Sequence, residues 1–200
     1  GEKKKPAISY WSKEKCTCPV CKKTFEKEVM LSGNGRMIAG KLSDDLHRTF
    51  EPSIKFGRVY PLIYEIGACP YCCSAMLWTD FKDLRDKNTA DELFDSREER
   101  REKCGTIFPH FNLKKERSLY DGCAMYYLAL LTYAKMPSDN LPTIKSAFLS
   151  LRMAWLTREL DMAVPGHNFK YISDVMYRKA LFFYQQSIFC ERSEEHTSEL

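Results

Sequence analysis

The chain has 200 residues, with 44% apolar and 13% aromatic content, nine cysteines and a formal net charge of +4. This length suits one domain or two small ones with a packed core, and the charge is too low for a dedicated nucleic-acid-binding protein. An odd cysteine count, with four in close pairs, favours metal binding in a reducing compartment over a secreted disulfide framework. We therefore expect a cytoplasmic protein. The longest uncharged apolar run, residues 124–134, is too short to cross a bilayer, so no membrane partner is expected.

The two ends of the chain differ from its interior. Residues 1–14 are polar and include Lys3, Lys4 and Lys5, which predicts a flexible basic arm. Residues 192–200 read RSEEHTSEL, which is typical of a translated sequencing adapter, so we interpret them as a scar outside the fold. Position 1 is Gly rather than Met. We expect the natural protein to begin before it and to continue beyond Glu191.

Residues 15–82 predict a small β-rich unit. Phe25, Val29 and Leu31 fall on one alternation and predict a strand over residues 24–31. A turn signal follows at residues 32–35. The rest of the unit is predicted as a returning strand over 36–42, an excursion with a short helical turn over 43–57, and a strand over 59–66.

Residues 83–112 predict a charged helical linker, and residues 113–191 predict a truncated all-α unit. Helical periodicity and proline-containing breaks predict three antiparallel helices, over 115–136, 143–160 and 169–189. Small residues beside aromatic ones are typical of tetratricopeptide repeat (TPR) helix pairs. On the second helix, we expect the buried stripe to be Ile144, Phe148, Leu151 and Trp155.

Two matched turns carry the chemistry of the sequence: Cys18-Pro19-Val20-Cys21 and Cys69-Pro70-Tyr71-Cys72. Zinc binds four thiolates tetrahedrally, and two tight turns that each offer two sulfurs supply that set. The 47 residues between Cys21 and Cys69 require an inserted hairpin and loop. When Cys18, Cys21, Cys69 and Cys72 all bind Zn²⁺, no position stays open for a substrate water. We therefore expect a structural zinc site and not a catalytic one.

Two neighbouring cysteines leave the ligand set open. Cys16 precedes Cys18 by two residues and Cys73 follows Cys72 directly, so either thiol could replace a ligand. We prefer the other four because only they form matched Cys-Pro-X-Cys turns. The position after such a turn often requires a positive φ angle and favours Gly. Here Lys22 and Cys73 occupy it.

A thiol-disulfide function is the main alternative. The second turn also resembles the active-site motif of glutaredoxins, with Cys69 or Cys72 as a low-pKa nucleophile at a helix N-terminus and Cys73 as a resolving thiol. No βαβ pattern surrounds the motif, and no later segment offers the opposing cis-proline of that fold. A second matched cysteine pair is also unnecessary for redox chemistry.

A nucleic-acid-associated zinc ribbon is the third interpretation. It would use basic residues near the first turn, namely Lys3, Lys4, Lys5, Lys13, Lys15, Lys22 and Lys23. The sequence shows no phosphate-binding loop, nucleophile elbow or carboxylate pair, so we expect no enzymatic activity. His47, His110 and His167 lack a partner at ligand spacing, and we expect surface or locally hydrogen-bonded roles for them.

The order of four segments resembles a bacterial family catalogued as Domain of Unknown Function 2225. These segments are CPVCKKTF, RVYPLIYEIGACPYC, ERSLYDGCAMYYLALLTYA and LRMAWLTREL, and the resemblance covers residues 16–190. Its more discriminating parts are Pro61–Tyr64 and Leu151–Leu156. The resemblance implies a zinc-knuckle-like N-terminus paired with TPR-like helices, and it implies no particular activity. This chain lacks the glycine that usually follows each cysteine turn in the family.

These observations predict an α+β fold, with a β-rich zinc-ribbon-like unit followed by an antiparallel, TPR-like helical unit. The predicted function is non-enzymatic. Zinc would supply folding energy to a module too small to fold alone, and the helices would bind a protein partner. The partner prediction rests on fold analogy.

Overall fold

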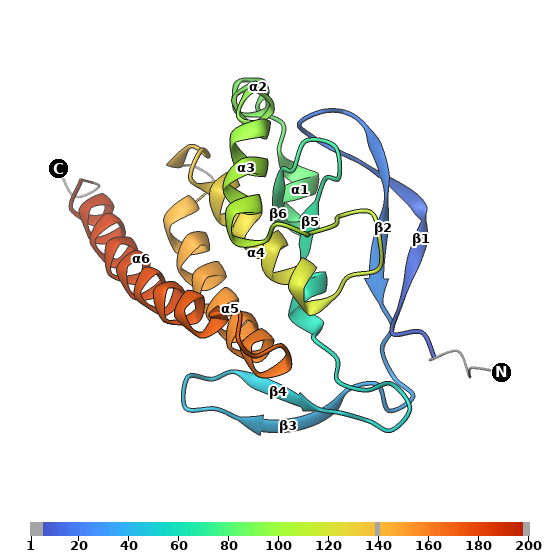
Figure 1. Cartoon of the computed structure of the whole chain (residues 1–200). Helices are drawn as coiled ribbons and strands as arrows, with labels where there is room; N and C mark the ends of the chain where they lie inside the picture. The colour runs from blue at the N-terminus through green and yellow to red at the C-terminus, as the bar shows by residue number, and fades with distance from the viewer. Residues whose placement is uncertain (1–5, 139–140, 198–200) are drawn as a thin grey trace.

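A computed structural model describes residues 6–138 and 141–197 of the chain (Figure 1). The expected α+β class is confirmed, since six α-helices accompany three two-stranded antiparallel sheets in this part of the chain. The elements in order are β1 (Ser9–Thr17), β2 (Thr24–Met30), β3 (Ile38–Leu42), β4 (Arg48–Glu51), the 3₁₀ helix η1 (Pro61–Tyr64), β5 (Ile66–Ala68), β6 (Ala75–Leu77), α1 (Trp78–Asp83), α2 (Lys87–Asp95), α3 (Arg97–Ile107), α4 (Leu119–Tyr133), α5 (Pro142–Ala163) and α6 (Phe169–Thr197).

Strand β1 begins within the segment expected to be a flexible arm, residues 1–14, and continues to Thr17. It pairs with β2 from Ser9↔Met30 to Thr17↔Thr24, with a bulge between Trp11 and Lys15. The hairpin is long, and Figure 1 shows it along one side of the molecule. Residues 1–5 of the expected arm lie outside the described residues.

The segment between the two cysteine turns differs from its prediction. Strand β3 pairs with the following strand, β4, and not with β2 as a returning strand would. Half of the segment expected to form a strand over 59–66 is the short helix η1. Pro61 occupies its first position, where a backbone N–H would have no partner within the helix. Figure 1 shows the β3–β4 hairpin beneath α5, away from the other strands.

Helix α4 is the centre of the core. It begins with a capping box, in which Ser118 and Asp121 each accept a hydrogen bond from the other's backbone N–H. Near its other end, Thr132 Oγ1 accepts a hydrogen bond from the N–H of Ala75 at 3.2 Å. Gly122 lies against Ile63, where an added Cβ would be 2.3 Å from the side chain. One continuous cluster of buried residues therefore joins the strands around the cysteine turns to the helices.

Helices α5 and α6 pack side by side, and α5 also contacts α4, so α5 is covered from two sides. Its fully buried residues include Leu149, Met153 and Leu156, and small residues such as Ala154 face α6, where Ser173 Oγ donates to the Ala154 carbonyl at 2.7 Å. The stripe expected to be buried is only half-buried (Ile144, Phe148, Leu151 and Trp155). The prediction of that stripe was wrong. Because α4 and α6 both pack on α5, its buried residues are distributed over two faces and not along one stripe.

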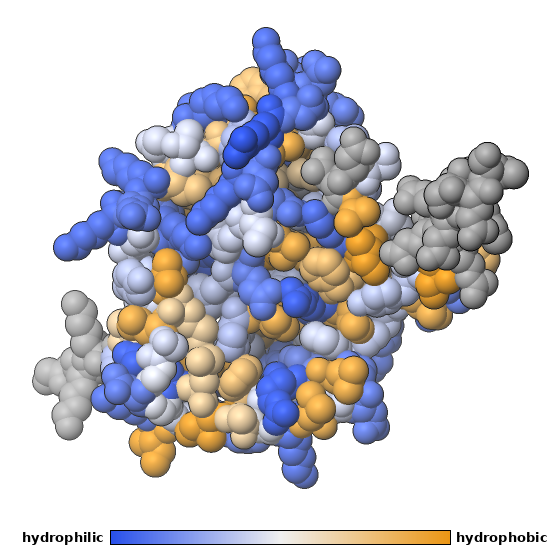
Figure 2. Space-filling view, turned by 180° about the vertical axis from the view of Figure 1, so that it is seen from behind, coloured by the Kyte–Doolittle hydropathy of each residue, from blue (hydrophilic) through white to orange (hydrophobic). Residues whose placement is uncertain are grey.

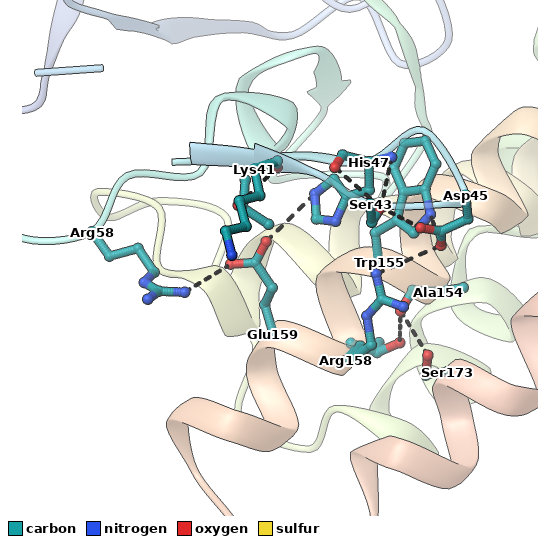
Figure 3. Close-up of polar contacts among 12 residues, drawn as sticks. Lys41, Ser43, Asp45, His47, Arg58, Ala154, Trp155, Arg158, Glu159 and Ser173 are labelled. Carbon is teal, nitrogen blue, oxygen red and sulfur yellow. Dashed lines mark hydrogen bonds and ion pairs between the residues drawn. The ribbon is translucent and has the colours of Figure 1, made fainter. Parts of the chain in front are cut away.

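The β3–β4 hairpin is fastened to α5 and α6 by a polar cluster (Figure 3). The His47 ring stacks on the Trp155 indole with centroids 4.7 Å apart, and His47 Nε2 lies 3.4 Å from Glu159 Oε1. Trp155 Nε1 donates to Asp45 Oδ2 at 2.8 Å, and the Tyr177 hydroxyl donates to the same carboxylate. The expectation of a surface or locally hydrogen-bonded His47 was wrong, since its side chain is buried against a helix distant in sequence.

The two ring nitrogens of His47 have different surroundings. Nε2 faces the Glu159 carboxylate at 3.4 Å, whereas Nδ1 is buried and has no hydrogen-bond partner within the described residues. Burial lowers the pKa of His47 and raises the pKa of Glu159.

Within the described residues, no helix is both long and apolar enough to cross a membrane.

Candidate metal centre

The two cysteine turns are copies of one local structure. Each closes an antiparallel hairpin, β1–β2 for the first turn and β5–β6 for the second. The backbone N–H of Cys18 donates to the Lys23 carbonyl, and that of Cys69 donates to the Ser74 carbonyl, both at 2.9 Å. Two similar knuckles thus meet from segments distant in sequence.

The structure brings the four predicted ligands together. The sulfur atoms of Cys18, Cys21, Cys69 and Cys72 all lie within 4.8 Å of one another. Between the turns, the sulfur of Cys18 lies 3.7 Å from that of Cys72, and the sulfur of Cys21 lies 3.6 Å from that of Cys69. Four sulfurs bound tetrahedrally to zinc at about 2.3 Å lie about 3.8 Å apart, so this donor set fits the ion with little adjustment.

Burial makes the cluster a closed site. Cys18 and Cys69 are fully buried, Cys72 is 1% exposed, and Cys21 is partly exposed. All four positions around a central ion would be protein sulfurs. Such a site can stabilise the fold but offers no open coordination position for a reacting water.

The expected backbone demand after each turn is confirmed. Lys22 and Cys73 have φ angles of 60° and 56°, in the left-handed region that favours glycine. In both turns, the N–H of this residue donates to the carbonyl of the first cysteine at 3.0 Å. These hydrogen bonds hold the two non-glycine residues in the conformation that the turn requires.

Arg100 is a buried cation beside the cluster, and the sequence reasoning missed it. Its guanidinium is 1% exposed and donates to the carbonyls of Cys72 (3.1 Å), Cys73 (3.4 Å) and Leu93 (2.6 Å). It also donates to the hydroxyl of Ser74 at 3.0 Å, and that hydroxyl lies 3.3 Å from the Cys72 sulfur. In the described part of the chain, no carboxylate lies within 4.0 Å of Arg100. A Zn²⁺ ion with four thiolates carries a net charge of −2, which this cation partly balances.

The pKa values of Cys18, Cys69 and Cys72 depend on one another. Hydrogen bonds from Cys18 and Cys69 lower the pKa of the Cys72 thiol. Hydrogen bonds that Cys69 donates to Cys18 and Cys72, together with burial, raise the pKa of the Cys69 thiol. A divalent cation must displace the remaining thiol protons when it binds, so its affinity should rise with pH.

The alternative ligands lie outside the cluster. Cys16 is partly exposed on β1, and burial raises its pKa. Cys73 is buried, its pKa is also raised by burial, and its sulfur is not among the four that gather within 4.8 Å. The residues after Cys72 form strand β6, so Cys69 and Cys72 do not stand at the helix N-terminus that the redox interpretation requires.

Comparison with known proteins identifies the family of the chain. Residues 11–199 match the family described as "Uncharacterized protein conserved in bacteria (DUF2225)". The chain belongs to this family. A Borreliella burgdorferi protein described as "Uncharacterized protein" is 38% identical to the DUF2225 chain over 179 residues. The match covers 89% of this chain and 63% of the relative, so the chain spans less than two thirds of that relative's length. No solved structure matches the chain significantly.

Proposed function

We propose that this DUF2225 protein is a non-enzymatic, zinc-stabilised protein whose helices bind a protein partner. The observation that carries the zinc assignment is the largely buried set of four sulfurs within 4.8 Å, presented by two matching knuckles. Bound zinc would join the β1–β2 hairpin to the β5–β6 hairpin. Because β5, β6 and η1 pack on α4, the ion would stabilise the strands against the helical core.

The helical unit supplies the surface for a partner. A groove of 390 Å³ lies where α4, α5 and α6 meet, and apolar residues such as Leu130, Leu131, Met136 and Phe183 line it. Exposed apolar side chains follow α6 beyond this groove, including Leu181, Phe182, Ile188 and Phe189. Figure 2 shows orange patches beside the C-terminal end of the molecule. Apolar surface gathered in this way is typical of protein-binding sites, and a TPR-like helix pair would present it.

The zinc assignment is tested by metal analysis of protein purified under reducing conditions. We expect one zinc per chain in the wild type and loss of both metal and cooperative folding in Cys18→Ser and Cys69→Ser. Cys16→Ser is the matched control, because it removes a thiol two residues from a ligand without touching the cluster. A folded, metal-free wild type whose Cys69 alkylates rapidly at neutral pH would overturn the zinc assignment and favour the thiol-disulfide alternative.

A further inference from the structure

A cavity of 420 Å³ opens beside the second knuckle, between the β1–β2 hairpin and the loop before α4. Three aromatic residues line it, Trp11, Phe25 and Tyr71, together with Lys15, Lys114 and Glu26. Its volume is within the range of small-ligand sites. The metal centre does not use these side chains, so the cavity needs a separate explanation.

Tyr71 is the most distinctive part of the wall. It lies between the two cysteines of its turn, and its backbone N–H donates to Cys69 Sγ at 3.4 Å. The side chain is 41% exposed although the backbone is fixed by the turn. Two ammonium groups flank its ring, Lys23 Nζ at 5.0 Å and Lys114 Nζ at 5.5 Å from the centroid. An exposed aromatic ring beside two cations can stack a planar group that carries negative charge.

The charge around the cavity is positive. Lys15, Lys23 and Lys114 form no ion pair with a carboxylate within 4.0 Å in the part of the chain that the structure describes. The acidic residue on the wall is Glu26, which lies opposite Lys15 in the β1–β2 register without forming an ion pair with it. Three lysines against one glutamate leave a net charge of +2. Exposed lysines without carboxylate partners are available to bind phosphate.

We propose that this cavity binds a nucleobase together with its phosphate, with the base stacked on Tyr71 and the phosphate held by Lys15 and Lys114. Two sources supply this chemistry, a single-stranded nucleic acid and a free nucleotide. Double-stranded nucleic acid does not, because its base faces are covered by stacking. The metal centre would act on this site indirectly, by fixing the backbone of Tyr71.

The binding test uses the zinc-loaded full chain and a fluorescein-labelled oligouridylate of about 12 nucleotides, followed by anisotropy at about 50 mM salt. We expect Tyr71→Ala to weaken binding by about 5- to 150-fold, which corresponds to the loss of one stacked base. Tyr71→Phe should keep most of the affinity, because it keeps the ring. Lys114→Gln should reduce the slope of log K against log[salt] by about 0.7, the value for one phosphate contact to a single strand.

The matched control is Lys55→Gln. Lys55 Nζ also lies over an aromatic ring, 5.2 Å from the centroid of Phe56, but Lys55 follows strand β4 and does not line the cavity. We expect this variant to bind like the wild type. Zinc content measured on every variant separates loss of the site from loss of the fold.

Competition identifies the source of the ligand. Displacement of the probe by unlabelled oligouridylate, but not by millimolar uridine monophosphate or by a duplex, supports single-stranded nucleic acid. Displacement by the monophosphate at micromolar concentration supports a nucleotide site. The proposal is wrong if the wild type does not bind the probe at low salt, if Tyr71→Ala binds like Tyr71→Phe, or if Lys55→Gln weakens binding as much as Lys114→Gln.

Discussion

Replacement of Arg100 by methionine tests how the buried charge supports the metal centre. Methionine keeps much of the length and volume of the side chain but removes all five hydrogen-bond donors. The carbonyls of Cys72, Cys73 and Leu93 then lose a partner that lies 2.6–3.4 Å away. The substitution also removes the positive charge behind the Cys72 sulfur.

The expected loss of stability follows from these contacts. A buried acceptor left without a donor costs about 1–3 kcal/mol. Part of that cost is returned, because burial of the guanidinium is itself unfavourable, as the lowered pKa of Arg100 shows. We expect the free energy of unfolding of zinc-loaded protein to fall by about 3 kcal/mol. Loss of the compensating charge should also weaken zinc binding by about 10- to 100-fold.

Two measurements separate these effects, urea unfolding of the zinc-loaded protein and zinc affinity by chelator competition. Arg101→Met is the control, because Arg101 donates to the Tyr71 carbonyl at 3.4 Å but is half exposed, and its one ion pair among the described residues is with Glu98. We expect the control to cost less than about 1 kcal/mol. If Arg100→Met bound zinc as tightly as the wild type, the charge-balance reasoning would be refuted. If it unfolded no more easily than Arg101→Met, the hydrogen-bond reasoning would fail.

Three further predictions concern stability of the zinc-loaded protein, measured by urea unfolding. Burial holds the folded pKa of His47 below its unfolded value of about 6.5, so the unfolded chain binds more protons below that pH. In a Glu159→Gln background, which removes the opposite contribution of a carboxyl with a raised pKa, stability should fall on acidification below pH 6.5 by up to about 1.4 kcal/mol per pH unit. If His47→Gln in the same Glu159→Gln background lost stability with falling pH to the same extent, His47 would not be the cause. Gly122→Ala should destabilise the protein by about 1–3 kcal/mol or more, because the added Cβ would overlap the Ile63 side chain. At Gly105 an added Cβ would have no neighbour within 4 Å outside its own helix backbone, so Gly105→Ala should stabilise helix α3 by up to about 1 kcal/mol. Equal effects of the two substitutions would rule out the steric reason. Lys22→Gly should stabilise the protein by about 1 kcal/mol, because φ at this position is 60°, in the left-handed region where glycine is not strained. A loss of stability would show that the lysine side chain contributes more than its strained backbone costs.

The local parts of the structure were predictable from the sequence. The cysteine pairing follows from two matched turns, and strand β2 begins at the predicted residue because its alternation and its boundary turn are both encoded locally. Helices α5 and α6 also begin within one residue of their predicted starts, at Pro142 and Phe169, where proline-containing breaks precede them. Strong local signals therefore specified the two cysteine turns, strand β2 and the starts of α5 and α6, but not strands β1, β5 and β6 beside the turns.

The long-range contacts were not predictable from the sequence. Arg100 lies among Glu98, Glu99 and Glu102 in a segment that reads as a solvated charged helix, and nothing local marks the one residue that faces the knuckle. His47 and Glu159 meet across more than a hundred residues. Their burial depends on how the β3–β4 hairpin docks on α5, which one sequence does not specify.

The position of the β3–β4 hairpin gives the metal centre an influence beyond the knuckles. The chain from Cys21 to Cys69 contains this hairpin, and both ends of that segment are fixed when the four sulfurs share an ion. Closing this loop restricts the conformations of the hairpin and keeps it near α5. The contacts of His47 and Asp45 with α5 then cost less conformational entropy to form. Without the ion, the Cys21 end of this segment would no longer be held beside the Cys69 end. The first contacts to open would then be those between the hairpin and α5, on the opposite side of the fold from the sulfurs.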